Sequence, residues 1–295
     1  MAAPALGRVV TAMVTPFNDD QSLDLEGARR LARHLVDTGT EAVLLAGSTG
    51  ESPTLNDDEL SDLTKAVKDE VGDEARVMVG TGTNSTATSI KATERAAADG
   101  ADAVLVVTPY YNKPDQTGLL EHFRAVAGAT DLPVLLYDIP GRTGREIALD
   151  TLLELAETPN IIGVKDAVLD LEKTGALAAS APPDFHIYSG QDSLNLPILA
   201  VGGVGFVSVA AHIVGAELAD MARSFETDPV KAREIHLRLM PFFRALFLDP
   251  NPAPLKAIMN DRGLPAGPVR PPLAPARGTT LDALRGALEV AGLPS

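Results

Sequence analysis

The chain has 295 residues, of which 45% are hydrophobic, and it carries a formal net charge of -15 at pH 7. This composition provides a large folded core and excludes a wholly disordered chain, and the acidic balance excludes nucleic acid and anionic membranes as partners, because both require a basic surface. The sequence contains no cysteine, so disulfides, thiolate nucleophiles and zinc–cysteine sites are excluded too. The N-terminus has no signal-peptide core and no apolar run approaches the ~20 residues that cross a bilayer, so we expect a cytoplasmic location.

Short runs of apolar and β-branched residues recur along the first 210 residues. They are continuous rather than alternating, which is typical of parallel strands that are covered on both faces. Helix-like segments such as 26–39 and 89–100 lie between them, and both end at a glycine. Eight strand–helix repeats at a spacing of roughly thirty residues predict an α/β fold, a (β/α)8 TIM barrel, with a doubly wound open sheet as the alternative. The predicted strands lie within 8–16, 41–47, 76–82, 101–109, 132–140, 161–166, 185–190 and 204–210.

The pattern becomes purely helical from about Glu217 onward. We expect a helix over 229–248, a proline-rich crossing over 265–278 and a last helix near 281–293. The sequence therefore predicts a catalytic barrel over residues 1–225 and a C-terminal helical domain over residues 226–295.

One lysine stands out at the end of a predicted strand. Lys165 closes the run IIGVK, and the C-terminal strand ends of a barrel form the mouth where active sites are built. A lysine held there is partly desolvated, which disfavours its charged form and leaves a neutral amine that can attack a carbonyl. The pattern therefore favours a Schiff-base lysine over a lysine that simply faces solvent.

Polar residues also follow other predicted strands. Tyr137 or Tyr111 can shuttle protons, and the hydroxyl of Ser48 can link two phenols in a relay. The GSTGE turn offers donors to a carboxylate, and Arg142 offers a bidentate fork to a second one. Each feature alone also fits packing or an ordinary turn, but together they describe a site that joins a keto acid to another carboxylated substrate. The strand ends concerned are GSTGES (47–52), TPYYNKP (108–114), YDIPGRTG (137–144) and YSGQD (188–192).

These segments, with GVKDA and DPNPAPLK, resemble the dihydrodipicolinate synthase (4-hydroxy-tetrahydrodipicolinate synthase) family. This family belongs to the pyruvate-dependent class I aldolase superfamily that includes N-acetylneuraminate lyase, and the resemblance extends from Val14 through the C-terminal helices. It implies a lyase in which a lysine forms a Schiff base with pyruvate. The enamine then condenses with aspartate 4-semialdehyde on the route to diaminopimelate and lysine.

The resemblance also implies roles for individual catalytic residues. Lys165 is the expected Schiff-base lysine, Tyr137 the expected proton-relay phenol, and Ser48 and Tyr111 complete the relay. In this family the second tyrosine of TPYYN reaches into the neighbouring subunit's site, so Tyr111 implies a catalytic dimer. The usual assembly in the family is a tetramer built from two such dimers, so the resemblance implies a homotetramer that is a dimer of dimers.

The remaining expected roles concern substrate binding. Thr49 and the backbone around it are expected to hold the pyruvate carboxylate, and Arg142 the carboxylate of the semialdehyde. The backbone at Gly190 and Val207 is expected to line the pocket. We expect no cofactor and no metal, because the chain matches no dinucleotide or phosphate-binding loop and its histidines lack paired metal spacing.

Ser48 is one departure from the family pattern. The synthases usually have GTTGE where this chain has GSTGE, and sialic acid lyases commonly carry serine at this position. Arg142 and the TPYYNKP segment favour the synthase over this alternative, a pyruvate-dependent aldolase acting on a sialic acid or a 2-keto-3-deoxy sugar acid. A catalytically silent metabolite-binding paralogue is a third possibility, which predicts a broken constellation of catalytic residues.

A second departure concerns regulation. Lysine-inhibited members of the family use histidines and a glutamate near the positions of Asp57, Leu60 and Thr88 in this chain, and only Asn84 and Tyr110 keep the expected types. Leucine offers no hydrogen bond to a bound amino acid, and the glutamate that would pair with its ammonium is missing. We therefore expect weak or absent feedback by lysine.

Overall fold

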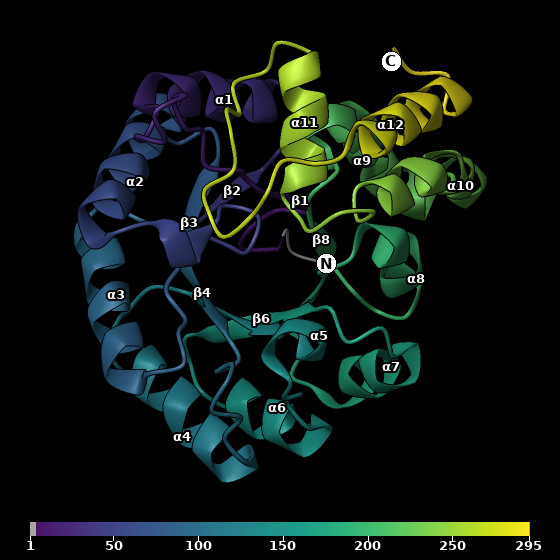
Figure 1. Ribbon diagram of the computed structural model, residues 1–295. Coiled ribbons are helices and arrows are strands. Elements are labelled where there is room, and N and C mark those ends of the chain that lie inside the picture. The colour runs from purple at the N-terminus through teal and green to yellow at the C-terminus, as the bar shows by residue number, and fades with distance from the viewer. Residues whose placement is uncertain (1–3, 295) are drawn as a thin grey trace.

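The computed structural model describes residues 4–294, and within them eight parallel strands close into a barrel surrounded by helices (Figure 1). Each strand pairs with the next one in the chain, and β8 pairs back with β1. This arrangement confirms the predicted (β/α)8 barrel. The strands are β1 (Val9–Ala12), β2 (Ala42–Leu45), β3 (Arg76–Gly80), β4 (Ala103–Val107), β5 (Val134–Asp138), β6 (Ile161–Asp166), β7 (His186–Ser189) and β8 (Gly205–Ser208).

The helices between the strands begin at residues that suit a helix N-terminus. For α1, α2, α3, α4 and α7 these residues are Asp24, Asn56, Ser85, Asp115 and Asp170, whose side-chain oxygens accept hydrogen bonds from the first turn. The helices that follow β1 to β8 are α1 (Leu25–Asp37), α2 (Asp57–Val71), α3 (Thr86–Ala98), α4 (Gln116–Ala127), α6 (Leu149–Ala156), α7 (Leu171–Ser180), α8 (Asn195–Ala200) and α9 (Ala211–Thr227). Short turns of helix lie at strand ends, η1 (Ser52–Thr54), α5 (Pro140–Thr143) and η2 (Asp192–Leu194).

The strand side chains alternate between two hydrophobic cores. One core lies between the strands and the helices, and the other fills the inside of the barrel. Both faces of the strands are therefore buried, which is the physical reason for their continuous apolar sequences. The inner core includes Leu44, Leu135, Tyr137, Tyr188 and Val207.

Three helices follow the barrel, α10 (Pro229–Ala245), α11 (Ala253–Asp261) and α12 (Gly278–Val290). α10 packs against α9, and α12 packs against both α10 and α11. The chain between α11 and α12 runs back across the loops that follow β1 and β2 (Figure 1). Phe17 N–H donates to the carbonyl of Ala266 at 3.3 Å, and the Arg270 guanidinium lies 4.0 Å from the Phe17 ring centroid. The C-terminal segment therefore supports one side of the barrel mouth. No helix within residues 4–294 has the length and apolar content needed to cross a membrane.

Candidate active site

Lys165 lies at the mouth end of β6, with Tyr137 of β5 and Tyr188 of β7 as its neighbours in the strand registers. Gly163 lets β6 pack closely against β7, because a Cβ at this position would come within 2.0 Å of the His186 carbonyl oxygen. Lys165 is only 5% exposed, and its amine nitrogen lies 4.2 Å from the centroid of the Tyr137 ring. The strand-end lysine thus points into the barrel mouth rather than into solvent.

Burial changes the protonation of this lysine. Desolvation lowers the pKa of Lys165 to about 7, the Asp192 carboxylate acts in the opposite direction, and the Arg142 guanidinium reinforces the lowering. Desolvation dominates because an ammonium loses its hydration in the barrel. A large fraction of Lys165 is therefore a neutral amine near pH 7, which is the form that attacks a carbonyl.

Tyr137 keeps its proton in the same environment. Burial raises the pKa of Tyr137 to about 12, although the Arg142 charge and a hydrogen bond with Ser48 both act to lower it. A protonated phenol beside an amine can donate a proton and take one back through the serine hydroxyl. The structure thus brings together three of the predicted residues, Lys165, Tyr137 and Ser48.

Thr49 is held in a tight loop directly after β2. Gly50 N–H donates to the Gly47 carbonyl at 3.1 Å, and the Thr15 hydroxyl donates to the Gly50 carbonyl at 2.7 Å. Glu51 has a left-handed backbone (φ 56°), so the chain turns sharply after Thr49. Thr49 itself is 3% exposed and accepts a hydrogen bond from Asn251 Nδ2 at 3.0 Å.

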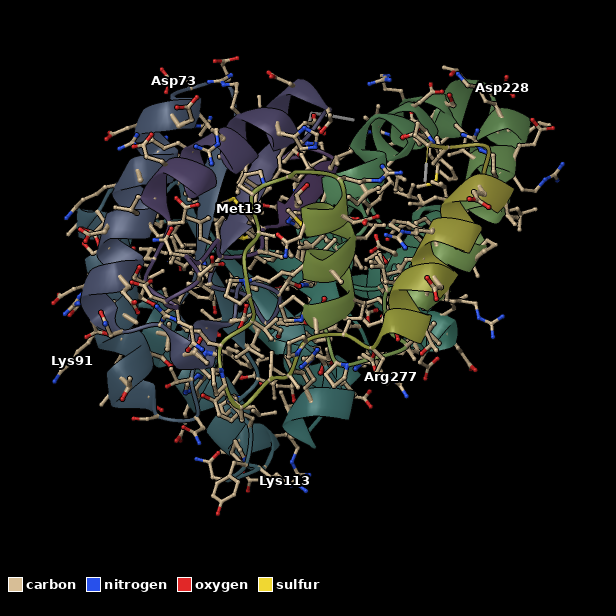
Figure 2. All side chains as sticks on the ribbon, turned by 45° about the horizontal axis from the view of Figure 1, so that its top comes forward. Met13, Asp73, Lys91, Lys113, Asp228 and Arg277 are labelled. Atoms are coloured by element: carbon tan, nitrogen blue, oxygen red, sulfur yellow. The ribbon has the colours of Figure 1, made fainter. Side chains whose placement is uncertain are left out.

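Arg142 and Tyr111 lie further out. Arg142 is exposed on the short helix α5, where it helps to line a hollow together with Tyr110 and Tyr111. Tyr111 has a left-handed backbone (φ 71°) and is 89% exposed. Figure 2 shows the nearby Lys113 at the edge of the molecule. Within one chain the Tyr111 phenol is therefore not brought together with Lys165 and Tyr137.

The last two predicted site residues lie close to the barrel interior. Gly190 donates its N–H to the Asp166 carbonyl at 2.7 Å, and a Cβ at this position would come within 3.1 Å of Lys165 Cγ. Gly190 thus leaves room for the stem of Lys165. Val207 is buried on β8 in the inner core that also contains Tyr137.

Asp192 is a site residue to which the sequence interpretation gave no role. Its buried carboxylate accepts hydrogen bonds from the Ser208 hydroxyl at 2.5 Å, from Val209 N–H at 3.0 Å and from Ala210 N–H at 2.9 Å. Burial raises the pKa of Asp192, and these donors act in the opposite direction. Its negative charge acts to raise the pKa of Lys165, against the lowering caused by desolvation. The YSGQD segment contains this acid, but nothing in its spacing shows that the Ser208 hydroxyl and the backbone N–H groups just after β8 donate to it.

Metal ligands do not gather at this site. Among residues 4–294, no group of three histidine, aspartate or glutamate side chains has an arrangement that could hold a metal ion. The polar groups of the site instead include an amine, a phenol, hydroxyls, a guanidinium and the buried Asp192 carboxylate. Such groups bind and protonate a carboxylated carbonyl compound.

The fold and the buried lysine define a class, the (β/α)8 barrels that present an amine at the mouth of the barrel. A sequence model of the Dihydrodipicolinate synthetase family matches residues 5–291, and the chain belongs to this family. The chain is 51% identical over 288 residues to the 4-hydroxy-tetrahydrodipicolinate synthase of Moorella thermoacetica, covering 97% of this chain and 99% of the relative. The 4-hydroxy-tetrahydrodipicolinate synthase of Thermosynechococcus vestitus is 46% identical over 289 residues, which cover 97% of this chain and 98% of the relative.

Solved structures agree with this assignment. The fold matches that of DHDPS from Cyanidioschyzon merolae, solved with lysine bound, with a TM-score of 0.96 and 44% identity over 98% of this chain and 99% of the other. It also matches a monomeric dihydrodipicolinate synthase variant with a TM-score of 0.95 and 37% identity over 98% of both chains. The family expected from the sequence motifs is confirmed.

Proposed function

We propose that this chain is a lyase that condenses pyruvate with aspartate 4-semialdehyde to give 4-hydroxy-tetrahydrodipicolinate, in the synthesis of diaminopimelate and lysine. The observation that carries this function is the buried Lys165, whose pKa is lowered to about 7 next to a protonated Tyr137. The curated relatives that cover 97% of the chain and are named 4-hydroxy-tetrahydrodipicolinate synthase support the same reaction.

The reaction begins with the neutral Lys165 amine. It attacks C2 of pyruvate, the former carbonyl oxygen leaves as water after protonation, and an iminium forms. Loss of a proton from the methyl group gives an enamine, whose carbon attacks the aldehyde carbon of the semialdehyde. The new alkoxide takes a proton, and the amino group of the second substrate attacks C2 and displaces Lys165. The sum is one product and one water from two substrates.

The other residues move protons and hold charge. Tyr137 and Ser48 carry protons to the departing oxygen and from the attacking amine, and Tyr111 extends this relay from a second copy of the chain. Thr49 binds the pyruvate carboxylate, and Arg142 binds the carboxylate of the semialdehyde through a charge-assisted hydrogen bond.

The backbone at Gly190 and Val207 lines the pocket beside these groups. We also propose that the chain divides into a catalytic barrel over residues 1–225 and a helical domain over residues 226–295. We also place the reaction in the cytoplasm, in agreement with the absence of cysteine from the sequence.

The assembly that we propose is a homotetramer built as a dimer of dimers. The support for it is Tyr111, which is 89% exposed with its backbone in the left-handed region, a conformation that non-glycine residues rarely adopt without a functional reason. A second copy docked at this surface would receive the phenol in its own site. One structural relative is a monomeric variant, so membership of the family does not by itself give the assembly. Light scattering of the purified protein measures its mass, and a mass of four chains is the expected result.

Ser48 supports a second candidate function, cleavage of a sialic acid or a 2-keto-3-deoxy sugar acid. The serine hydroxyl lacks the methyl group that restricts a threonine side chain, so it leaves more room beside Tyr137. Arg142 favours the synthase because the second carboxylate of the condensation needs a cation. Purified protein given each sugar acid, with released pyruvate as the readout, compares the two functions.

The deciding experiment measures pyruvate consumption with aspartate 4-semialdehyde, coupled to the reductase that consumes the product and NADPH. We expect turnover by the wild type and none by Lys165→Ala. Lys91→Ala is the matched control, because Lys91 projects from the outside of α3 (Figure 2) and its loss leaves turnover unchanged. Absence of turnover by the wild type, with an active coupling enzyme, rejects the synthase function.

A further inference from the structure

The loop that carries Thr49 is held by side chains from a distant part of the chain. Asn251 follows α10, 202 positions beyond Thr49, and its Nδ2 donates to the Thr49 hydroxyl oxygen at 3.0 Å. Both residues are buried, Asn251 at 7% exposure and Thr49 at 3%. A buried contact of this kind fixes the threonine side chain far more firmly than a contact with solvent does.

A buried ion pair holds the next turn of the same loop. The Lys256 ammonium of α11 lies 2.7 Å from one Glu51 carboxylate oxygen, and the other oxygen accepts the Arg270 backbone N–H at 2.8 Å. Lys256 also donates to the Pro268 carbonyl at 2.8 Å and lies 4.3 Å from the Phe17 ring centroid. Glu51 occupies a left-handed conformation that a residue other than glycine keeps only when its surroundings hold it there.

The direction of the Asn251 hydrogen bond has a chemical consequence. A side-chain NH2 group is a donor only, so the Thr49 hydroxyl uses an oxygen lone pair for this bond. The hydroxyl hydrogen is then free to donate to another acceptor. Because threonine is β-branched, its side chain has few rotamers, and the bond to Asn251 selects one of them.

We propose that Asn251 is a positioning residue for the binding of pyruvate, because it orients the Thr49 hydroxyl toward the substrate carboxylate while the Glu51–Lys256 pair fixes the loop beneath. This inference rests on the proposed function, which assigns the pyruvate carboxylate to Thr49. It makes the C-terminal segment part of substrate recognition, although this segment supplies none of the groups that touch pyruvate.

The first test is Asn251→Ala in the full-length protein. We expect the pyruvate KM to rise about tenfold, the effect of one lost orienting hydrogen bond. The kcat at saturating pyruvate and the KM for the semialdehyde stay within about threefold of the wild type, because the interaction contributes to ground-state and transition-state binding alike. Asn251→Asp keeps the shape, and its ionised carboxylate accepts but cannot donate, so at least the same rise is expected from a variant that leaves no cavity.

Asn160→Ala is the matched control. Asn160 is a half-buried asparagine at the opposite end of the barrel, where its Nδ2 donates to the carbonyls of Ala127, Thr130 and Leu132. Its removal costs stability and lowers the Tm without touching the mouth. We expect Asn160→Ala to leave the pyruvate KM unchanged even when its Tm falls as far as that of Asn251→Ala.

Borohydride trapping of the Lys165 adduct measures pyruvate binding without the semialdehyde. The concentration that gives half-maximal trapping should rise about tenfold in Asn251→Ala for pyruvate, but less than about threefold for methyl pyruvate, which has no carboxylate charge. In a Thr49→Val background, Asn251→Ala should have no further effect, because Asn251 acts through the threonine hydroxyl.

Two results overturn the inference. One is a pyruvate concentration for half-maximal trapping that changes no more in Asn251→Ala and Asn251→Asp than in Asn160→Ala. The other is an undiminished effect of Asn251→Ala in the Thr49→Val background. Failure of the wild type to turn over the semialdehyde rejects the proposed function alone, because trapping with pyruvate still tests Asn251.

Discussion

The pH dependence of adduct formation at Lys165 tests the chemistry of the site most directly. Burial lowers the pKa of Lys165 to about 7, whereas an exposed lysine titrates near 10.4. At about pH 7.5, a lysine with a pKa of about 7 is roughly three-quarters neutral, and one with a pKa near 10.4 is roughly a thousandth neutral. We therefore expect Lys165 to react with pyruvate several hundredfold faster than exposed lysines at this pH, from amine availability alone.

The assay is a pH series of initial trapping rates. Purified protein is mixed with pyruvate from about pH 5.5 to about pH 9.5, reduced with borohydride and digested. The adducts at Lys165 and at exposed Lys91 are then quantified in the same sample. Because deprotonation creates the nucleophile, the Lys165 rate should rise with pH and level off above about pH 8.

The pH at which the Lys165 trapping rate is half-maximal reports the pKa of its amine. Arg142 helps to lower the pKa of Lys165, so Arg142→Ala should move the midpoint upward. Asp192 acts in the opposite direction, so Asp192→Asn should move it downward. A wild-type midpoint above about pH 9, or a Lys165 profile that coincides with the Lys91 profile, would refute the reasoning that burial creates a neutral amine.

Arg142→Ala should also raise the KM for aspartate 4-semialdehyde on the order of tenfold to a hundredfold, the range of a lost charge-assisted hydrogen bond, while saturating pyruvate still gives the Lys165 adduct. Tyr111→Phe removes one phenol oxygen and should lower kcat on the order of a hundredfold without changing the mass of the assembly in light scattering. Added lysine should give half-inhibition only above about 1 mM, an affinity weaker than roughly 4 kcal/mol. Leu60 offers no hydrogen bond, and the Asp57 carboxylate lies 3.2 Å from the Arg95 guanidinium.

Each of these three predictions has a control variant or a result that would contradict it. Arg145→Ala removes a guanidinium that donates to the Lys113 carbonyl at 3.0 Å, and an equal rise in the semialdehyde KM would contradict the role of Arg142. An unchanged kcat in Tyr111→Phe would remove Tyr111 from the relay. Half-inhibition by lysine below about 1 mM would show that the altered residues still form an effector site.

The succession of strands and helices was predictable because it depends on residues that are neighbours in the sequence. The strands of the barrel are buried on both faces, so each appears in the sequence as a short continuous apolar run, and turn and capping residues separate them from the helices. The boundaries are less well determined, since the predicted strand over 204–210 is Gly205–Ser208 and the predicted last helix near 281–293 is Gly278–Val290. The division at residue 225 stays a prediction.

The sequence by itself determined the alternation of eight strands and helices and the position of Lys165 at a strand end, because these patterns depend on residues close together in the chain. Only the tertiary structure decided how strongly Lys165 is desolvated, and how far the Asp192 charge counteracts the resulting fall in the lysine pKa. It also decided that Asn251 meets Thr49 across 202 positions of sequence. Desolvation and hydrogen-bond partnership depend on which distant groups the closed barrel and its C-terminal helices bring together, and that distance in sequence leaves no periodic signal to detect.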